Sequence, residues 1–490
     1  MTLASLLEQH AKRTPDSTAL QCGDRALTFR DLHATSDALA GWFLAEGLKP
    51  GDRIAIQWPN AIEVVQLFFA AFKAGIIAVP INLRLKPSEI AYVMQDAGAA
   101  ICFAHPKLAE GVRASGIRTL SELPSLQAAP SASPLPPVSE DAPALILYTS
   151  GSTGRPKGAV LSQRALVATG EVCASIVENF EPGLKTRGLL MTPLMHSSGL
   201  FVLLSSFHRG EPCVLLPMFD AAAVLDAVER FRCTTTLSLP AMMQFVLQEQ
   251  ARQPRDVSSL RVIFAGGDSV PVPLQERTRE LLGCLMVEGL AQTETGPTIG
   301  NPPVNPKLGS LGMNHPSIDV RLVDFVTRQP VGVDEPGELL VRSPALCSGY
   351  WQNPAATAEA FEDGWFRTGD LVSRDADGYY WFRGRLKEII IRGGSNISPQ
   401  EVEEALYSHP DVLEVAVVGL PHEVWGEVVI AAVARREGRT VSEADLREHA
   451  RQTLADYKVP ERIYFMPELP KGPTGKVLRR SIREGLPALQ

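Results

Sequence analysis

A run of glycines and hydroxyl residues that ends in a lysine has the composition of a polyphosphate-binding loop. It reads Thr149-Ser150-Gly151-Ser152-Thr153-Gly154-Arg155-Pro156-Lys157-Gly158 and follows a short apolar run. Glycine N–H groups can turn toward an anion because no Cβ stands in the way. The hydroxyls add short donors, and Lys157 adds a positive charge. The spacing differs from that of a Walker A loop, in which the lysine directly follows a glycine.

Three segments further on carry the other groups that nucleotide chemistry needs. Met191 to His196 ends in a histidine, and the glycine turn Ala265-Gly266-Gly267-Asp268 follows an apolar run. Glu288-Gly289-Leu290-Ala291-Gln292-Thr293-Glu294 ends in a carboxylate. A carboxylate beside a bound triphosphate is a natural Mg²⁺ ligand, because Mg²⁺ takes a few carboxylate oxygens together with phosphates and water.

Four segments nearer the C-terminus continue the series. The segment 364–370 ends in Asp370, and 382–388 contains Arg385 and Lys387. A glycine pair stands at 393–394, and a Gly/Pro-rich loop ends at Lys476. Each segment alone is weak evidence, because a lysine in such a loop or an aspartate in a turn is usually a surface residue.

Taken in order, these segments resemble the signatures of the adenylate-forming superfamily. That superfamily contains acyl-CoA synthetases, the adenylation domains of peptide synthetases and beetle luciferases. The ordered series extends from about Leu27 to Arg479, nearly the whole chain. The residues of these segments are most similar to those of bacterial acyl-CoA synthetases and aryl-CoA ligases of the chlorobenzoate type. The resemblance implies an AMP-forming ligase that uses ATP, Mg²⁺ and CoA with a small-molecule carboxylic acid.

The resemblance also implies a role for each matching residue. The implied catalytic residues are Lys476, His196, Thr149 and Glu294; Lys476 would bridge the carboxylate and the α-phosphate, and Glu294 would bind the metal. The implied ATP and AMP contacts are Thr149, Ser150, Gly151, Ser152, Thr153, Gly154, Lys157, Gly266, Gly267, Glu288, Gly289, Leu290, Ala291, Thr293, Asp370, Phe382, Arg385 and Lys476.

Acyl and CoA contacts follow from the same resemblance. The implied acyl contacts are His196, Ser197, Gly199, Leu200, Gly266 and Ala291. Their mostly small or apolar character favours an acid with an uncharged tail, aromatic or medium-chain aliphatic. The implied CoA contacts are Gly393, Gly394, Trp425, Tyr457 and Lys458, and Lys387 falls at the interdomain hinge. Val459 stands where the chlorobenzoate-type ligases would have a phosphate-binding arginine.

Three other functions are considered beside the CoA ligase. A stand-alone adenylation enzyme could load a carrier protein instead of CoA. Ser197 and Ser198 provide no aspartate for an ammonium group, which disfavours an amino-acid substrate. A degenerate nucleotide-binding regulator stays open because Leu290 and Ala291 replace the usual aromatic-Gly pair. A light-emitting oxidase is not excluded by the motifs, but no residue favours it.

Composition narrows the partners and the compartment. The 490 residues are 45% hydrophobic and carry a net charge of −8 with no long basic run, which argues against nucleic acid. Seven dispersed cysteines without metal-ligand spacing fit a reducing compartment, and the first residues do not resemble a signal peptide, so we expect a cytoplasmic protein. The longest apolar stretch, residues 62–81, is interrupted by charges and predicts no membrane span. A homodimer is compatible with the sequence.

Alternating short apolar strands and helices predict an α/β fold with parallel sheets covered by helices. We expect a large N-terminal adenylate-forming domain over residues 1–386, which includes a β subdomain, and a small mobile α+β domain over 387–490. Capping boxes are predicted at two helix starts, one from Asn60 and Glu63 and one from Ser398 and Glu401.

Overall fold

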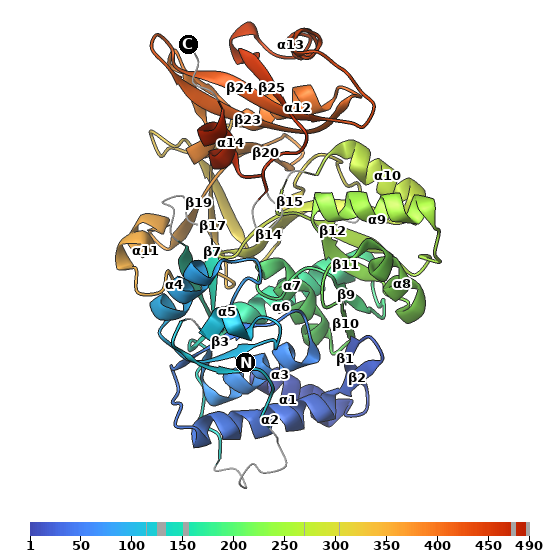
Figure 1. Cartoon of the computed structure of the whole chain (residues 1–490), viewed down its shortest axis with the longest axis vertical. Coiled ribbons are helices and arrows are strands. Elements are labelled where there is room, and N and C mark those ends of the chain that lie inside the picture. The colour runs from blue at the N-terminus through green and yellow to red at the C-terminus, as the bar shows by residue number, and fades with distance from the viewer. Residues whose placement is uncertain are drawn as a thin grey trace. The chain divides into compact units, whose positions relative to one another are not determined.

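The computed structural model describes residues 1–113, 115–124, 134–149, 156–268, 270–302, 304–471 and 477–486. Figure 1 labels their helices and strands. Tertiary contacts divide the chain into two units. Unit 1 holds residues 1–320 and 341–366, and unit 2 holds residues 321–340 and 367–490. The expected domain boundary between residues 386 and 387 stays a prediction.

Unit 1 contains a nine-stranded sheet in the order β15-β14-β13-β12-β11-β9-β10-β1-β2. Neighbours from β13 to β1 are parallel, and β2, β14 and β15 are added antiparallel. The strands are β1 (Thr18–Cys22), β2 (Arg25–Thr28), β9 (Gly188–Leu190), β10 (Cys213–Leu215), β11 (Thr235–Ser238), β12 (Val262–Ala265), β13 (Leu285–Gln292), β14 (Gly296–Gly300) and β15 (Met313–Asn314).

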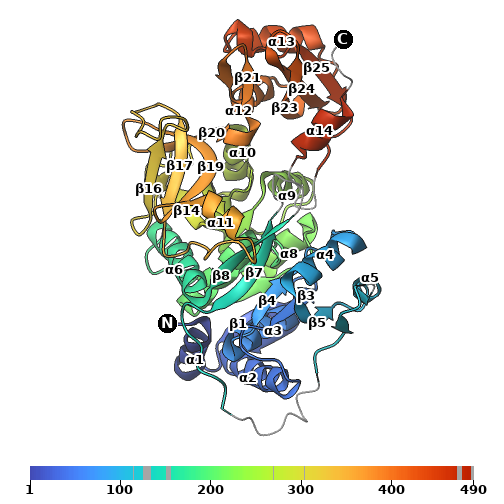
Figure 2. The ribbon, with the colours of Figure 1, turned by 90° about the vertical axis from the view of Figure 1, so that its left-hand side faces the viewer.

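A second sheet of unit 1 has six strands in the order β6-β5-β3-β4-β7-β8. All neighbours are parallel except β7 and β8, which form an antiparallel pair that can be followed in Figure 2. The strands are β3 (Arg53–Gln57), β4 (Ile77–Pro80), β5 (Ala99–Ala104), β6 (Arg118–Leu120), β7 (Pro143–Thr149) and β8 (Lys157–Ser162).

Helices cover both faces of these sheets, as the alternating pattern predicts. One apolar core lies between the two sheets and includes residues of α1, α2, α3 and α7, while α8 to α10 cover the far face of the larger sheet and α4 with α5 that of the smaller one. The helices are α1 (Leu3–Arg13), α2 (Phe29–Ala45), α3 (Ile62–Ala74), α4 (Pro87–Ala97), α5 (Ala109–Arg113), α6 (Gln163–Phe180), α7 (Ser197–Arg209), α8 (Ala221–Phe231), α9 (Pro240–Arg252), α10 (Val272–Leu282) and α11 (Pro354–Ala360).

Helix α3 explains the longest apolar stretch of the sequence. Nearly all of its residues are buried, so the stretch fills the core between the sheets. No helix in the described part of the chain is long and apolar enough to span a membrane.

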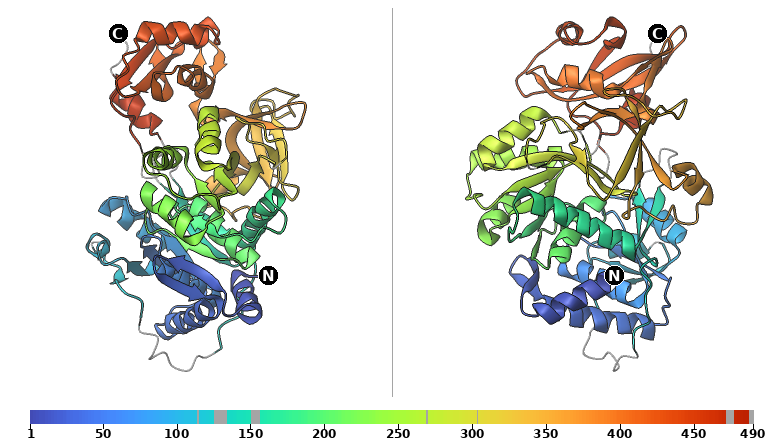
Figure 3. Two further views of the ribbon diagram at one scale, coloured as in Figure 1. Left: turned by 90° about the vertical axis from the view of Figure 1, so that its right-hand side faces the viewer. Right: turned by 180° about the vertical axis from the view of Figure 1, so that it is seen from behind.

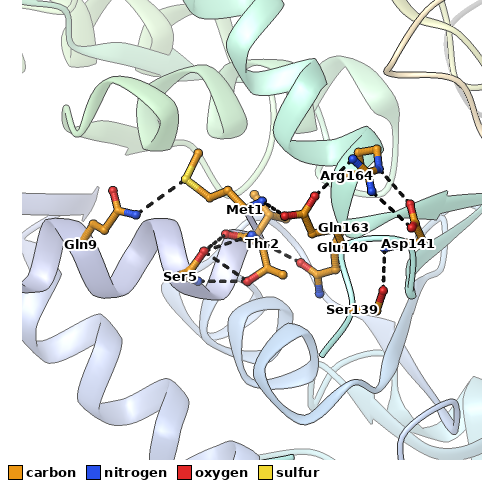
Figure 4. Close-up of polar contacts among 10 residues, drawn as sticks. Met1, Thr2, Ser5, Gln9, Ser139, Glu140, Asp141, Gln163 and Arg164 are labelled. Carbon is orange, nitrogen blue, oxygen red and sulfur yellow. Dashed lines mark hydrogen bonds and ion pairs between the residues drawn. The ribbon is translucent and has the colours of Figure 1, made fainter. Parts of the chain in front are cut away.

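The N-terminal residues that lead into α1 bond to the segment that precedes β7 and to the start of α6 (Figure 4). The Thr2 side chain caps α1, and the Leu3 amide donates to Gln163 Oε1 at 3.2 Å. The Met1 amino group is paired with Glu140. These contacts fix the element that leads into β7, and β7 ends at Thr149.

A third sheet has the order β16-β17-β19-β18, with β20 paired to β19. Its strands are β16 (Asp319–Val323), β17 (Gly337–Arg342), β18 (Phe361–Glu362), β19 (Trp365–Arg374) and β20 (Tyr380–Arg385), and the short helix η2 (Leu386–Glu388) follows. The division between the units runs through β16, β17 and β19.

The rest of unit 2 is an α+β layer around a five-stranded sheet, drawn in orange and red in Figure 3. Helices α12 and α13 pack on one face of β23 and β24, and α14 packs on the other. The elements are β21 (Ile390–Arg392), β22 (Ser395–Ile397), α12 (Pro399–Tyr407), β23 (Val412–His422), β24 (Gly426–Arg435), α13 (Glu443–Arg451), η3 (Asp456–Lys458), β25 (Arg462–Met466) and α14 (Arg479–Gly485). The predicted α/β class, with a small α+β part at the C-terminus, is confirmed.

Both predicted capping boxes are wrong. Helix α3 has Ala61 at its N-cap with no side-chain cap, and Asn60 bonds elsewhere. Ser398 does precede α12, but its hydroxyl donates to the Arg383 carbonyl and caps no helix N–H. In both cases a tertiary partner outcompetes the local cap, because a buried carbonyl or N–H left unpaired costs more than a cap contributes.

Candidate functional site

The candidate segments of unit 1 lie at the carboxyl ends of parallel strands. Strand β9 leads to the segment that ends at His196, β12 leads to Gly266-Gly267, and β13 leads toward Thr293-Glu294. Strand β11 pairs in parallel with both β9 and β12, and β12 pairs in parallel with β13, so these ends share one edge of the sheet. In open α/β sheets, ligands bind at this edge.

Thr149, Lys157 and Glu294 are brought together although the carboxylate comes 145 positions after the threonine. The Thr149 hydroxyl lies 3.4 Å from both Glu294 Oε1 and the Lys157 carbonyl oxygen, so its single proton is shared between these two acceptors at the end of β7. Glu294 is 9% exposed and lies in the turn between β13 and β14. The Thr149 side chain at one end of the predicted phosphate loop therefore contacts the predicted metal ligand.

Tyr350 is a member of this cluster that the sequence analysis missed. Its hydroxyl donates to Glu294 Oε1 at 3.0 Å, and Lys157 Nζ lies 5.3 Å from the centroid of its ring. Burial, and then the neighbouring Glu294 charge, raise the pKa of Tyr350, so the phenol stays protonated and acts as a donor. No spacing rule links residues 294 and 350, and only the folded chain places them in contact.

The His196 segment ends at the N-terminus of α7, where His196 is the N-cap residue. Asn82 Nδ2 lies 3.3 Å from His196 Nε2. Thr293 Oγ1 donates to Ser197 Oγ at 3.4 Å, which joins the start of α7 to the Thr293-Glu294 turn. A Cβ at Gly199 would lie 2.5 Å from the Pro193 carbonyl oxygen, so this helix start requires glycine. The predicted acyl and metal residues of unit 1 are thus neighbours.

Asn60, which the sequence predicts as a helix cap, instead holds the segment that leads to His196. Its Oδ1 accepts from the Leu194 amide at 2.8 Å, and its Nδ2 donates at 3.0 Å to the carbonyls of Thr192 and Leu216. The residue is 3% exposed. The Asn60 amide thereby joins the segment after β9 to the segment after β10. From the sequence, a polar residue before a helix predicts only a helix cap, so this contact could not be predicted.

The glycine turn packs tightly against β13. A Cβ at Gly266 would lie 3.0 Å from the Gly289 carbonyl oxygen, and one at Gly289 would lie 2.8 Å from the Ile299 carbonyl oxygen. Gly267 has a φ of +84°, which favours glycine. Leu290 and Ala291 are half-buried on β13 at a break in its register with β14.

Glu288 points elsewhere than its sequence neighbours. It is 7% exposed, and its Oε1 accepts from the Val270 amide at 3.3 Å. This contact joins β13 to the start of α10. The Glu288 side chain therefore makes a structural hydrogen bond, and its predicted nucleotide contact stays a prediction.

Asp370 and Arg385 face each other across β19 and β20 in unit 2. They are register partners, and Arg385 Nε lies 3.0 Å from Asp370 Oδ1. The aspartate side chain is fully buried, whereas the arginine side chain is 47% exposed. Phe382 is half-buried on the same strand as Arg385. An exposed guanidinium thus covers a buried carboxylate. The resemblance implies that these two groups bind the ribose or the phosphates, and this role stays a prediction.

Gly393 and Gly394 form the turn between β21 and β22. Their φ angles are +56° and +83°, as a two-residue hairpin with positive φ at both positions needs. The Gly393 amide donates to the Trp425 carbonyl at 2.8 Å, and a Cβ at Gly393 would lie 3.0 Å from the Trp425 ring. The absence of a side chain at Gly393 therefore lets the Trp425 ring pack closely against the turn.

Trp425 and Tyr457, the two predicted CoA aromatics, are 48% and 45% exposed. Arg392, which the sequence analysis did not select, lies between them: its Nη1 donates to the Tyr457 carbonyl at 2.9 Å, and its guanidinium lies 5.9 Å from the Trp425 ring. Lys458 Nζ is paired with Glu401 at 2.6 Å. The surface therefore presents two aromatic faces beside Arg392, and both cations are engaged in ion pairs, Arg392 with Glu461 at 3.5 Å and Lys458 with Glu401.

Several predicted site residues lie outside the described residues: Ser150, Gly151, Ser152, Thr153, Gly154 and Lys476. Lys387 is exposed in η2, between β20 and β21. Lys476 lies between the described residues Lys471 and Val477, which form an isolated bridge. The roles of all these residues stay predictions.

The donors near Glu294 fit a cation that takes most of its ligands from a nucleotide and water. Within the described ranges, no cluster of three or more histidine, cysteine, aspartate or glutamate side chains could hold a metal by itself. Among the described residues, the two hydrogen bonds to the Glu294 side chain both fall on Oε1, and the described part of the chain places no hydrogen bond on Oε2. One carboxylate oxygen beside a hydroxyl suits Mg²⁺, which keeps several waters or phosphate oxygens.

Comparison with known proteins agrees with this geometry. Residues 7–351 match the family model described as AMP-binding enzyme, and residues 401–476 match the AMP-binding enzyme C-terminal domain. A feruloyl-CoA synthase from an Amycolatopsis species is 37% identical, with 98% of both chains covered. A fatty acid–[acyl-carrier-protein] ligase from Streptomyces coeruleorubidus is 33% identical over 99% of this chain and 96% of its own. The structure of o-succinylbenzoate CoA synthetase from Bacillus subtilis with its acyl-adenylate intermediate is 30% identical, covers 98% of this chain and 97% of its own, and superposes with a TM-score of 0.88.

Proposed function

Because the chain belongs to the AMP-binding enzyme family, we propose that it is an ATP-dependent acid–thiol ligase that makes acyl-CoA. In the first step a carboxylate oxygen attacks the α-phosphorus of ATP, and pyrophosphate leaves. In the second step the CoA sulfur attacks the acyl carbon, AMP leaves, and the thiol proton goes to solvent. The observation that carries the proposal is the cluster of Thr149, Lys157 and Glu294 at the carboxyl edge of parallel strands.

Side chains of unit 1 serve the first step in this proposal. Thr149 and Lys157 bind the triphosphate, and Glu294 would hold Mg²⁺, which would neutralise phosphate charge. His196 and the start of α7 face the acid, since the Ser197 hydroxyl is bonded to Thr293 beside Glu294. Lys476 meets the α-phosphate while negative charge builds up there.

Side chains of unit 2 serve the ribose and the thiol. Asp370 and Arg385 bind the ribose and phosphates. The hairpin at Gly393-Gly394 and the exposed faces of Trp425 and Tyr457 bind CoA, because an aromatic face stacks on adenine. Lys387 is the hinge at which a C-terminal domain, residues 387–490, rotates between the two steps, since one rigid domain cannot present two opposite faces to one site.

The tail of the carboxylic acid is uncharged, either aromatic or medium-chain aliphatic. The His196 segment offers Gly199 and Leu200, both buried, and no charged residue among Ser197 to Leu200. We place the protein in the cytoplasm, because its seven cysteines are all free thiols. A homodimer is compatible with this function and is checked by light scattering.

Pyrophosphate release across a panel of carboxylic acids, with and without CoA, tests the proposal. We expect release with aromatic or medium-chain acids, and equal amounts of AMP and acyl-CoA by mass spectrometry when CoA is present. A parallel arm supplies a phosphopantetheinyl carrier protein. Efficient loading of the carrier without CoA turnover would make the carrier-protein ligase the better description. Absence of pyrophosphate with every acid would favour a nucleotide-binding regulator.

A further inference from the structure

One short segment of unit 1, Cys347 to Trp351, holds Glu294 by both its backbone and its side chain. The Cys347 amide donates to the Glu294 carbonyl at 2.7 Å, and the Tyr350 hydroxyl donates to Glu294 Oε1 at 3.0 Å. A turn residue held at both ends has few alternative positions for its carboxylate. The segment therefore determines which way the Glu294 side chain points.

The same segment is also fixed to β8, the strand that leaves the phosphate loop. The Ser348 amide donates to the Val160 carbonyl at 2.8 Å, and the Trp351 amide donates to the Gly158 carbonyl at 2.7 Å. Tyr350 lies opposite Ala159 in this pairing. The register places the Tyr350 ring beside Lys157, the first residue of β8.

Tyr350 consequently has a cation on one side and a carboxylate on the other. Lys157 Nζ lies 5.3 Å from the centroid of its ring, and its hydroxyl is bonded to Glu294. Among the residues that the structure describes, no ion pair joins Lys157 to Glu294. A direct pair would neutralise both groups, and each would then be less available to a phosphate or a metal ion.

We propose that Tyr350 is a positioning residue: its hydroxyl holds Oε1 of Glu294 so that Oε2 faces the cation, and its ring keeps Lys157 apart from that carboxylate. This inference rests on the proposed function, because it concerns the metal and nucleotide of the same site. Tyr350 touches neither reacting atom, and it acts through Glu294 and Lys157.

Tyr148 provides a matched control on the opposite face of the sheet. Its hydroxyl donates to Asp96 Oδ2 at 2.5 Å, so it is also a half-buried tyrosine bonded to a carboxylate. It packs against the core under α4, whereas Tyr350 packs against the core between the sheets. Replacing either tyrosine by phenylalanine removes one phenol–carboxylate bond and keeps the ring.

The test measures Mn²⁺ binding by electron paramagnetic resonance in the presence of a non-hydrolysable ATP analogue. A hydrogen bond to a charged group accounts for about a tenfold change in an equilibrium constant. We expect Tyr350→Phe to weaken Mn²⁺ binding about tenfold and to change nucleotide binding in EDTA less than about twofold. Tyr148→Phe should lower the melting temperature about as much as Tyr350→Phe does, and it should leave Mn²⁺ binding unchanged.

Tyr350→Leu removes the ring as well and lets Lys157 approach Glu294. We expect this variant to weaken nucleotide binding in EDTA also, by about tenfold. Wild-type Mn²⁺ affinity in Tyr350→Phe overturns the inference, as does equal weakening with and without metal. Absence of Mn²⁺-dependent nucleotide binding in the wild-type protein overturns it too. The proposed function is decided separately, by pyrophosphate release from the wild-type enzyme with the acid panel.

Discussion

The Arg385 guanidinium covers the fully buried Asp370 carboxylate, with Nε 3.0 Å from Oδ1. The two residues are register partners on β19 and β20, so the pair is part of the sheet itself. A buried carboxylate needs such a partner, because an uncompensated charge inside a protein is costly. The Arg385 side chain is itself about half exposed, so it can contact a ligand while it remains paired with Asp370.

Asp370→Ala should remove the enzyme's preference for ATP over deoxy-ATP. If the carboxylate accepts from the ribose hydroxyls, each lost hydrogen bond to a charged group changes discrimination by roughly tenfold or more. The measurement is kcat/KM for ATP, 2′-deoxy-ATP and 3′-deoxy-ATP in pyrophosphate release. If the variant keeps the wild-type ratio, Asp370 serves the sheet and Arg385 only.

Lys476→Ala should abolish acyl-AMP formation and spare thioester formation from supplied acyl-AMP. The reason is that the lysine matters while charge develops on the α-phosphate, and one electrostatic contact of this kind contributes on the order of 10²–10³ in rate. The two half-reactions are measured separately. Lys471→Ala is the control, because this nearby lysine is paired with Glu414 at 2.5 Å. Equal loss in both half-reactions would contradict the assignment.

Asn60→Ala should destabilise the protein and impair use of the acid. The substitution removes three side-chain hydrogen bonds, two of them buried, and leaves the Thr192 carbonyl and the Leu194 amide unpaired, so we expect a loss of roughly 2–4 kcal/mol in the free energy of unfolding. The KM for the acid should rise, because the segment leads to His196, while the KM for CoA stays constant. Urea unfolding and steady-state kinetics measure the two effects. An unchanged KM for the acid would restrict Asn60 to stability.

Trp425→Ala should raise the KM for CoA and leave the adenylation rate nearly unchanged. Loss of a stacking face removes binding that is equal in the ground and transition states. Val424→Ala is the matched control, because Val424 is adjacent and 74% exposed. Unchanged CoA kinetics in Trp425→Ala, together with efficient loading of a carrier protein, would favour the carrier-protein ligase.

Acidification should destabilise unit 1 through His10. Its Nε2 lies 2.8 Å from the Phe207 carbonyl oxygen, and burial lowers its pKa. The unfolded chain therefore binds a proton that the folded chain resists, so stability is full above an ordinary histidine pKa of about 6.5 and falls as the pH drops below it. Between pH 7.5 and 5.5 the melting temperature should fall, and less so in His10→Gln, whose amide can still donate to Phe207. An identical fall in both proteins would assign the effect to other groups.

Local chemistry explains why so much could be predicted from the sequence. Glycines and hydroxyls in a loop after a strand favour an anion site, and alternating apolar runs predict parallel sheets covered by helices. The ordered signatures from the phosphate loop to the loop of Lys476 identified the family, which the comparisons confirm. The assignment of individual roles to these residues stays a prediction.

The contacts of Asn60 and Ser398 show where local rules fail. Ser398 stands directly before α12 and Asn60 two positions before α3, and both have the side chains of good caps. Each instead satisfies a backbone group from a distant segment, and for Asn60 that partner is Leu194, 134 positions away. A sequence rule cannot rank a cap against a partner whose position depends on how two strands are paired.

The sequence by itself determined the α/β class, the family and the stretches that carry the chemistry, because these depend on residue type and on spacing along the chain. Only the tertiary structure decided that Tyr350 stands between Lys157 and Glu294. The tyrosine comes 56 positions after the carboxylate it bonds, and its place follows from the pairing of its segment with β8. Such a contact has no spacing of its own, because its geometry is set by strand register and burial, which exist only once the chain has folded.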